Sequence, residues 1–354
     1  MARPVNIPKR QAPKVNQTAQ QIPPLNALIQ EGLSLHKRGK LQEAQTIYAQ
    51  VLTIQPNHFD ALQLFGLLLA QIKNYPVAVD CLTRALQINP NHGVSHNNLG
   101  NILKELNRID EALVSYDRAI TINPNFADAY NNRGNILKEL NRIDEAVISY
   151  DRAITINPKF AEAYKNRGNI LKELNRFDEA LASYDQAIGC NQNKADIHNS
   201  RGNTLIELNR FDEALVSYDR AISINPNFAE AYNNRGFLFI GLDNLSGAEE
   251  SYQIATKTSS EKNIRFSAIL YLAIIAYLKG DLKGMGDLLS SSHSILPVSE
   301  GPLKNQRAYW EYLFSLLVWH HKNNPDEIKS TAIEKLYVIG ESHALSYHGM
   351  VIIP

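Results

Sequence analysis

Ser342 is the residue whose surroundings most suggest covalent chemistry. A short β-prone run, LYVI at 336–339, leads into GESH at 340–343. A serine at a turn after a strand can act as a nucleophile when a base is positioned to take its proton. Only twelve residues follow Ser342. We expect these to be too few for the separate elements that would hold a base and an oxyanion site, because an independent domain needs about 50 residues.

This segment resembles the first block of the SGNH/GDSL-type hydrolases, in which the nucleophilic serine follows the first strand. The later blocks of that family, which would supply an oxyanion hole and a His–Asp pair, have no counterpart here. We therefore predict no enzyme activity, and Ser342 remains the single catalytic candidate. Residues 336–354 are interpreted as a short strand-turn segment, or as the first fragment of a truncated domain.

The cysteines and histidines do not form a ligand pattern. Cys81 and Cys190 are far apart, and the neighbours His320 and His321 lack further ligands. We predict no metal site and no cofactor. Lys plus Arg equals Asp plus Glu at 36 each, and a chain without a basic excess lacks the footprint of a nucleic-acid binder. No run reaches the roughly 20 apolar residues that span a bilayer, so we expect a cytoplasmic protein without membrane contact.

Asparagines at regular spacing are the candidate binding residues. An asparagine amide both donates and accepts hydrogen bonds, and because asparagine is a poor helix former, helix propensity does not explain its recurrence. Residues three apart share a helix face, so a row of these amides could hold the backbone of an extended peptide. The row is interrupted at Ser200 and ends at Phe237. Its members are Asn98, Asn101, Asn132, Asn135, Asn166, Asn169, Asn203 and Asn234.

These asparagines belong to a repeat of 34 residues. Residues 97–126 and 131–160 differ at four of thirty positions. The same phase gives seven units: 25–58, 59–92, 93–126, 127–160, 161–194, 195–228 and 229–262. Every unit has glycine at position 8 and alanine at position 20, and six have tyrosine at position 24. Among these residues are Gly100, Gly134, Gly168, Gly202 and Gly236, and Ala112, Ala146, Ala180 and Ala214.

A 34-residue period with these residues resembles the tetratricopeptide repeat family. The resemblance implies an all-α fold, a right-handed α-solenoid of helix-turn-helix repeats with a short non-repeat C-terminal tail. Within a unit, small Gly134 and Ala146 let the two helices approach, Tyr150 fills the space beside them, and Pro158 ends the second helix. The resemblance also places positions 2, 5, 6, 9, 12 and 13 on a concave groove. Stacked units would bury their apolar faces together.

The ends of the chain depart from the repeat. Residues 1–24 hold five prolines and no acid, so we predict a disordered tail. Residues 266–299 are predicted to form a divergent eighth repeat. Residues 301–335 are interpreted as capping helices that cover it, with an exposed aromatic docking stripe as the alternative.

The pattern predicts a scaffold that binds extended segments of other proteins in the groove. The asparagine row resembles the ladder in the repeat arm of O-linked N-acetylglucosamine transferases. An alternative function is therefore the recognition arm of a larger enzyme, hydrolase-like or glycosyltransferase-associated, whose catalytic domain is truncated or absent. Duplication alone could also have copied the asparagines, or they could bond between adjacent repeats and stiffen the array. Near-identical repeats leave weak self-association open.

A carboxylate clamp for acidic chain ends is another binding mode in the family that the sequence resembles. Lys165 and Asn169 match its pattern, whereas Ser200, Glu230 and Asn234 do not. We therefore predict no clamp.

Overall fold

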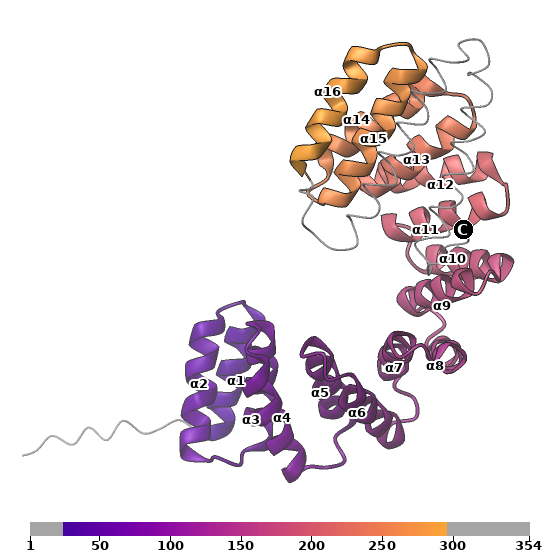
Figure 1. The fold of residues 1–354 in the computed structure, drawn as a ribbon. Coiled ribbons are helices and arrows are strands. Elements are labelled where there is room, and N and C mark those ends of the chain that lie inside the picture. The colour runs from indigo at the N-terminus through magenta and orange to yellow at the C-terminus, as the bar shows by residue number, and fades with distance from the viewer. Residues whose placement is uncertain (1–23, 296–354) are drawn as a thin grey trace, which may run out of the picture. The chain divides into compact units, whose positions relative to one another are not determined.

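The computed structural model describes residues 24–295, and every regular element in that range is a helix (Figure 1). The predicted all-α fold of helix pairs is confirmed. The predicted N-terminal tail, the capping segment 301–335 and Ser342 lie outside the described residues. The helices are α1 (Leu25–Lys37), α2 (Leu41–Ile54), α3 (Phe59–Gln71), α4 (Tyr75–Ile88), α5 (Gly93–Glu105), α6 (Ile109–Ile122), α7 (Ala127–Glu139), α8 (Ile143–Ile156), α9 (Ala161–Glu173), α10 (Phe177–Cys190), α11 (Ala195–Glu207), α12 (Phe211–Ile224), α13 (Ala229–Gly241), α14 (Leu245–Thr258), α15 (Lys262–Leu278) and α16 (Leu282–Ile295).

The helices pack as consecutive pairs, α1 with α2 through α15 with α16. They fall into two compact units, one holding α1–α6 and the other α7–α16. Within each unit, the second helix of one pair also packs on the first helix of the next, as α8 does on α9. The limits of the 34-residue repeats are not defined by these contacts and stay a prediction.

A residue with left-handed backbone geometry joins the two helices of each pair. Asn141 has φ 57°, and the amide of the following Arg142 donates to the Leu137 carbonyl across 2.8 Å. This bond closes the end of α7 in the manner of a Schellman turn. Glycine, asparagine or aspartate occupies the equivalent position in the other pairs except one, where Lys73 has φ 62°. Glycine and asparagine adopt this conformation at least cost.

The two helices of a pair meet where glycine faces an aromatic ring. A Cβ atom on Gly134 would lie 2.6 Å from Cε1 of Tyr150, closer than carbon atoms can approach. Ala146 and Tyr150 are fully buried beside it. In the second pair the ring is replaced by Leu82, and a Cβ on Gly66 would stay 3.1 Å from Cγ of that leucine. Glycine is therefore needed where a tyrosine ring faces this position, and less strictly where a leucine does.

The last described pair begins with a longer first helix than the other pairs have. The predicted eighth repeat starts at Phe266, but α15 starts at Lys262 and has 17 residues. Three residues, 263–265, separate the predicted seventh and eighth units. An α-helix has 3.6 residues per turn, so an insertion of this length adds nearly one turn to α15. The hydrophobic pattern begins only at Phe266, which is why the extra turn was not predicted.

Candidate functional site

The predicted groove asparagines all lie on the first helices of their pairs. Asn98 and Asn101 lie on α5, in the first compact unit. The other six lie on α7, α9, α11 and α13 in the second unit, and all six are half-buried. We call these six the asparagine face: Asn132, Asn135, Asn166, Asn169, Asn203 and Asn234.

The asparagines at position 9 share one contact, which fixes the orientation of their amides. The Tyr150 hydroxyl donates to Oδ1 of Asn135 across 2.7 Å. The same bond joins Tyr116 to Asn101, Tyr184 to Asn169, and Tyr218 to Asn203, at 2.7, 2.8 and 2.7 Å. Because the oxygen faces the buried tyrosine, the amide offers its nitrogen, with two N–H donors, on the other side. Sequence alone had left both donor and acceptor roles open.

Two pairs keep the tyrosine but lack this asparagine, and their tyrosines show what it does. Leu33 and Phe237 stand at position 9 beside Tyr48 and Tyr252. Both hydroxyls are buried without a hydrogen-bond partner among the described residues. Burial also raises the pKa of Tyr48 to about 12. The position-9 asparagine therefore supplies the acceptor that a buried tyrosine hydroxyl otherwise lacks.

The asparagines at position 6 bond to the preceding pair of helices. Nδ2 of Asn166 donates to Oδ1 of Asn131 across 3.0 Å, and Asn234 donates to Asn199 across the same distance. Asn131 and Asn199 are almost fully buried. These bonds join adjacent pairs, as one of the sequence-based alternatives supposed.

The sequence analysis missed the position-5 residues that bond to these asparagines, although one sequence difference points to them. Where position 5 is Lys165 rather than asparagine, position 6 of the next unit is Ser200. At this boundary both members of the asparagine pair are replaced. Asn233 keeps the position-5 asparagine but loses its partner, because position 6 of the following unit is Tyr271. Oδ1 of Asn233 is buried without a partner among the described residues.

Opposite charges on neighbouring first helices leave the second unit's face close to neutral. Nζ of Lys138 lies 2.5 Å from Oε1 of Glu173. Lys165 contacts Glu162 at 2.7 Å and Asp196 at 3.0 Å. Burial acts to lower the pKa of Lys165, but these two carboxylates raise it above its ordinary value. The one lysine that matched a carboxylate clamp is thus already bound to acids of its own chain.

The arginines at position 7 tie three helices together. On α9, Arg167 donates from Nη1 to Oγ of Ser183 across 2.7 Å and from Nε to Oδ1 of Asp151 across 2.6 Å. Ser183 lies on the second helix of the same pair and Asp151 on that of the preceding pair. Arg201 repeats both contacts with Ser217 and Asp185. These arginines therefore have a structural role.

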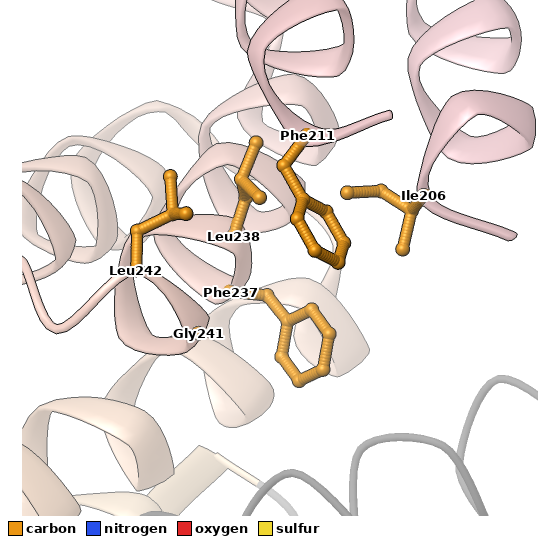
Figure 2. A pocket seen from close by; sticks show the side chains of 6 residues that line it. All are labelled: Ile206, Phe211, Phe237, Leu238, Gly241 and Leu242. Carbon is orange, nitrogen blue, oxygen red and sulfur yellow. The ribbon is translucent and has the colours of Figure 1, made fainter. Parts of the chain in front are cut away.

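An apolar pocket lies where the asparagine face ends. Its cavity volume is about 20 Å³, and it is partly open to solvent. The side chains of Ile206, Phe211 and Phe237 border one common space (Figure 2). Leu238, Gly241 and Leu242 complete the lining. The sequence analysis noted Phe237 only as the end of the asparagine row and did not predict a pocket.

Two kinds of feature are absent from residues 24–295. No helix in this range is long and apolar enough to span a membrane. The same range holds no cluster of three or more His, Cys, Asp or Glu side chains placed to bind a metal ion.

Comparison with solved structures finds the same fold in other proteins. The chain is similar to a tetratricopeptide repeat protein from Parabacteroides merdae, with TM-score 0.56 and 17% identity over 69% of this chain and 98% of that one. It is also similar to the pilF protein of Pseudomonas aeruginosa, with TM-score 0.53 and 19% identity over 58% of this chain and 94% of that one. None of the curated proteins matches the sequence.

Models of the tetratricopeptide repeat match the sequence without a gap from residue 29 to residue 242. The matched segments are 29–92, 81–114, 100–141, 127–160, 149–182, 168–208 and 202–242. Together they cover more than half of the chain. The chain belongs to the tetratricopeptide repeat family.

Proposed function

We propose that this protein is an interaction scaffold that binds extended segments of partner proteins along α7, α9, α11 and α13. The observation that carries the proposal is the bond from tyrosine to Oδ1 of each position-9 asparagine, for example Tyr150 to Asn135. It leaves the amide nitrogens of Asn135, Asn169 and Asn203 as donors. The natural ligands of such donors are the backbone carbonyls of a peptide.

The spacing of the donors suits an extended chain. Packed helices lie roughly 8–10 Å apart, and an extended peptide advances about 3.3 Å per residue. Amides one repeat apart would therefore meet about every third residue of the peptide. Contacts of this kind depend little on the peptide's side chains, and the paired charges of Lys138 with Glu173 give the face no strong preference for acidic or basic ligands.

The proposal assigns binding, and no catalytic step, to the described helices. The hydrolase-like form of the enzyme-arm alternative rests on Ser342, which lies outside the described residues, and its glycosyltransferase-associated form rests on the resemblance of the asparagine row. We therefore propose the scaffold as the function of this chain.

The test changes the donors while keeping the acceptors. In the double variant Asn135→Asp, Asn169→Asp, a carboxylate oxygen still accepts from Tyr150 and Tyr184, but the two amide nitrogens are gone. Peptides are first selected on the full chain from a random twelve-residue phage library, and their binding is then measured by fluorescence anisotropy. We expect the double variant to bind them at least about ten-fold more weakly, since each lost hydrogen bond is worth about 1 kcal/mol.

The matched control adds the same two charges elsewhere. Gln186 on α10 and Gln253 on α14 are exposed, and the variant Gln186→Glu, Gln253→Glu should bind as the unchanged protein does. Circular dichroism checks that both variants keep their helices. Failure to select any peptide, or equal binding by both variants, would refute the proposed function.

A further inference from the structure

We propose that the apolar pocket of Ile206, Phe211, Phe237, Leu238, Gly241 and Leu242 is a specificity subsite, which takes one short aliphatic side chain of the peptide bound on the asparagine face. The inference rests on the proposed function and adds a side-chain preference to it. The occupant is a partner peptide with an uncharged anchor residue.

The pocket arises because three groove positions change their chemistry at one place. In the preceding pairs, position 9 is asparagine, position 12 is lysine and position 13 is glutamate, and Lys138 is bonded to Glu173 across the boundary. At the boundary between the pairs α11/α12 and α13/α14, Ile206 and Gly241 replace that lysine and glutamate. Phe237 replaces the asparagine. The ion pair that covers this surface elsewhere is absent at this boundary.

The chemistry of the lining selects the occupant. All six lining residues are uncharged, and the exposed surface of the pocket is almost wholly carbon. Burying a charged group here would cost much more than it gains, whereas an apolar side chain gains about 25 cal/mol for each Å² removed from water. The loss of Glu at 241 also opens space, because glycine has no side chain.

The pocket continues the asparagine face. Asn203 stands at position 9 one repeat before Phe237, and its Oδ1 accepts from both Tyr218 and Asn234, at 2.7 and 3.0 Å. Its amide nitrogen is thus the last position-9 donor before the pocket. A peptide whose carbonyl met that nitrogen would place a side chain about three residues further along at Phe237, by the same spacing argument.

The structure offers a variant that closes the pocket with residues the chain itself uses. Ile206→Lys, Gly241→Glu restores the pair found at Lys138 and Glu173. The control, Val216→Lys, adds a lysine at a site on α12 whose side chain is 69% exposed. Both variants are made in the full chain. The probes are the peptide most enriched from the twelve-residue library and the same peptide with its apolar anchor changed to alanine.

We expect the unchanged protein and the Val216→Lys control to prefer the anchored peptide by roughly ten-fold, the value of one buried side chain. The pocket variant should bind both peptides equally. The Asn135→Asp, Asn169→Asp variant should weaken both peptides by the same factor and keep the preference. That pattern separates the pocket from the amides.

Other results would overturn the subsite. If peptides bind but show no anchor preference, or if the pocket variant keeps that preference, the pocket inference is wrong and the scaffold stands. If no peptide binds, both fail. An unchanged preference together with faster hydrogen exchange in residues 301–323 of the pocket variant would identify the chain's own segment as the occupant. Loss of a dimer in light scattering would identify a second copy instead.

Discussion

The helix pairs with an asparagine at position 9 differ in one buried contact from two other pairs that carry the same tyrosine. In α7 and α8, the Tyr150 hydroxyl has its acceptor in Asn135. In α1 with α2 and in α13 with α14, Tyr48 and Tyr252 are as deeply buried but find no partner among the described residues. The same residue type thus lies in two environments within one chain, and the residue at position 9 is one difference between them.

This difference changes how the asparagine row is interpreted. A row of repeated asparagines looks like a ligand-binding feature, but the oxygen of each position-9 amide already has a structural partner. The position-6 amides of Asn166 and Asn234 likewise bond to buried neighbours. Recurrence is therefore explained in part by the fold. What remains for a ligand is the set of amide nitrogens that the tyrosines hold in place.

The largest expected effect comes from the glycine that faces the ring. Gly134→Ala would place Cβ 2.6 Å from Tyr150, and we expect overpacking to cost about 1–3 kcal/mol in the unfolding free energy of that pair. Gly66→Ala is the matched case, since Leu82 stands in place of the ring with its nearest atom 3.1 Å away. In Gly66→Ala the clash is smaller, and the higher helix propensity of alanine offsets it. The unfolding free energy of that pair should therefore change little.

Hydrogen exchange resolved to α3, α4, α7 and α8 is the suitable measurement, because neighbouring repeats can open separately. Protection of α7 and α8 should fall in Gly134→Ala, while protection of α3 and α4 should hold in Gly66→Ala. Equal losses in the two variants would show that the ring does not set the need for glycine.

The tyrosine hydroxyls give the next largest effect, and with opposite expectations in the two regions. Tyr150→Phe removes a made hydrogen bond and should cost about 1 kcal/mol. Tyr252→Phe removes a buried hydroxyl that has no partner among the described residues. It should cost nothing and could add up to about 1 kcal/mol. Urea unfolding of each variant against the unchanged chain gives the two differences.

A further substitution sharpens the same test. Phe237→Asn would give the Tyr252 hydroxyl an acceptor in the register of Asn135, and Tyr252→Phe made on that background should then become costly. If both tyrosines respond alike in every background, the acceptor at position 9 is not what distinguishes the two regions.

The repeat, the helix pairs and the left-handed turns follow from sequence because each depends on local residue types. An asparagine such as Asn141 favours a turn, and a proline such as Pro158 ends a helix, whatever the surrounding fold. The turn at Gln192 lacks the proline, yet Asn193 still donates its amide to Oδ1 of Asn191 at 3.1 Å. That bond is a local feature too, and it keeps the helix limits of α10 and α11 in step with the other pairs.

The site could be predicted only in part, because its contacts join residues far apart in the sequence. The bond from Asn166 to Asn131 spans 35 positions, and nothing in either residue alone indicates it. The pocket at Phe237 depends on Ile206 and Gly241 from two different repeats. The extra turn of α15 was missed because its residues, unlike those after Phe266, carry no hydrophobic pattern.

The smallest expected effect concerns the turn between α3 and α4, where Lys73 has φ 62° and the other described turns of this kind have Gly, Asn or Asp. A lysine pays a steric cost for this conformation that asparagine largely avoids. Lys73→Asn should raise the unfolding free energy by about 0.5–1 kcal/mol, and Asn141→Lys should lower it by a similar amount. Both side chains are exposed at the turn, so lost packing does not confuse the comparison. Thermal unfolding of the two variants, each compared with the unchanged chain, measures both changes in unfolding free energy. A gain at both positions, or at neither, would show that backbone strain is not what separates the lysine turn from the asparagine turns.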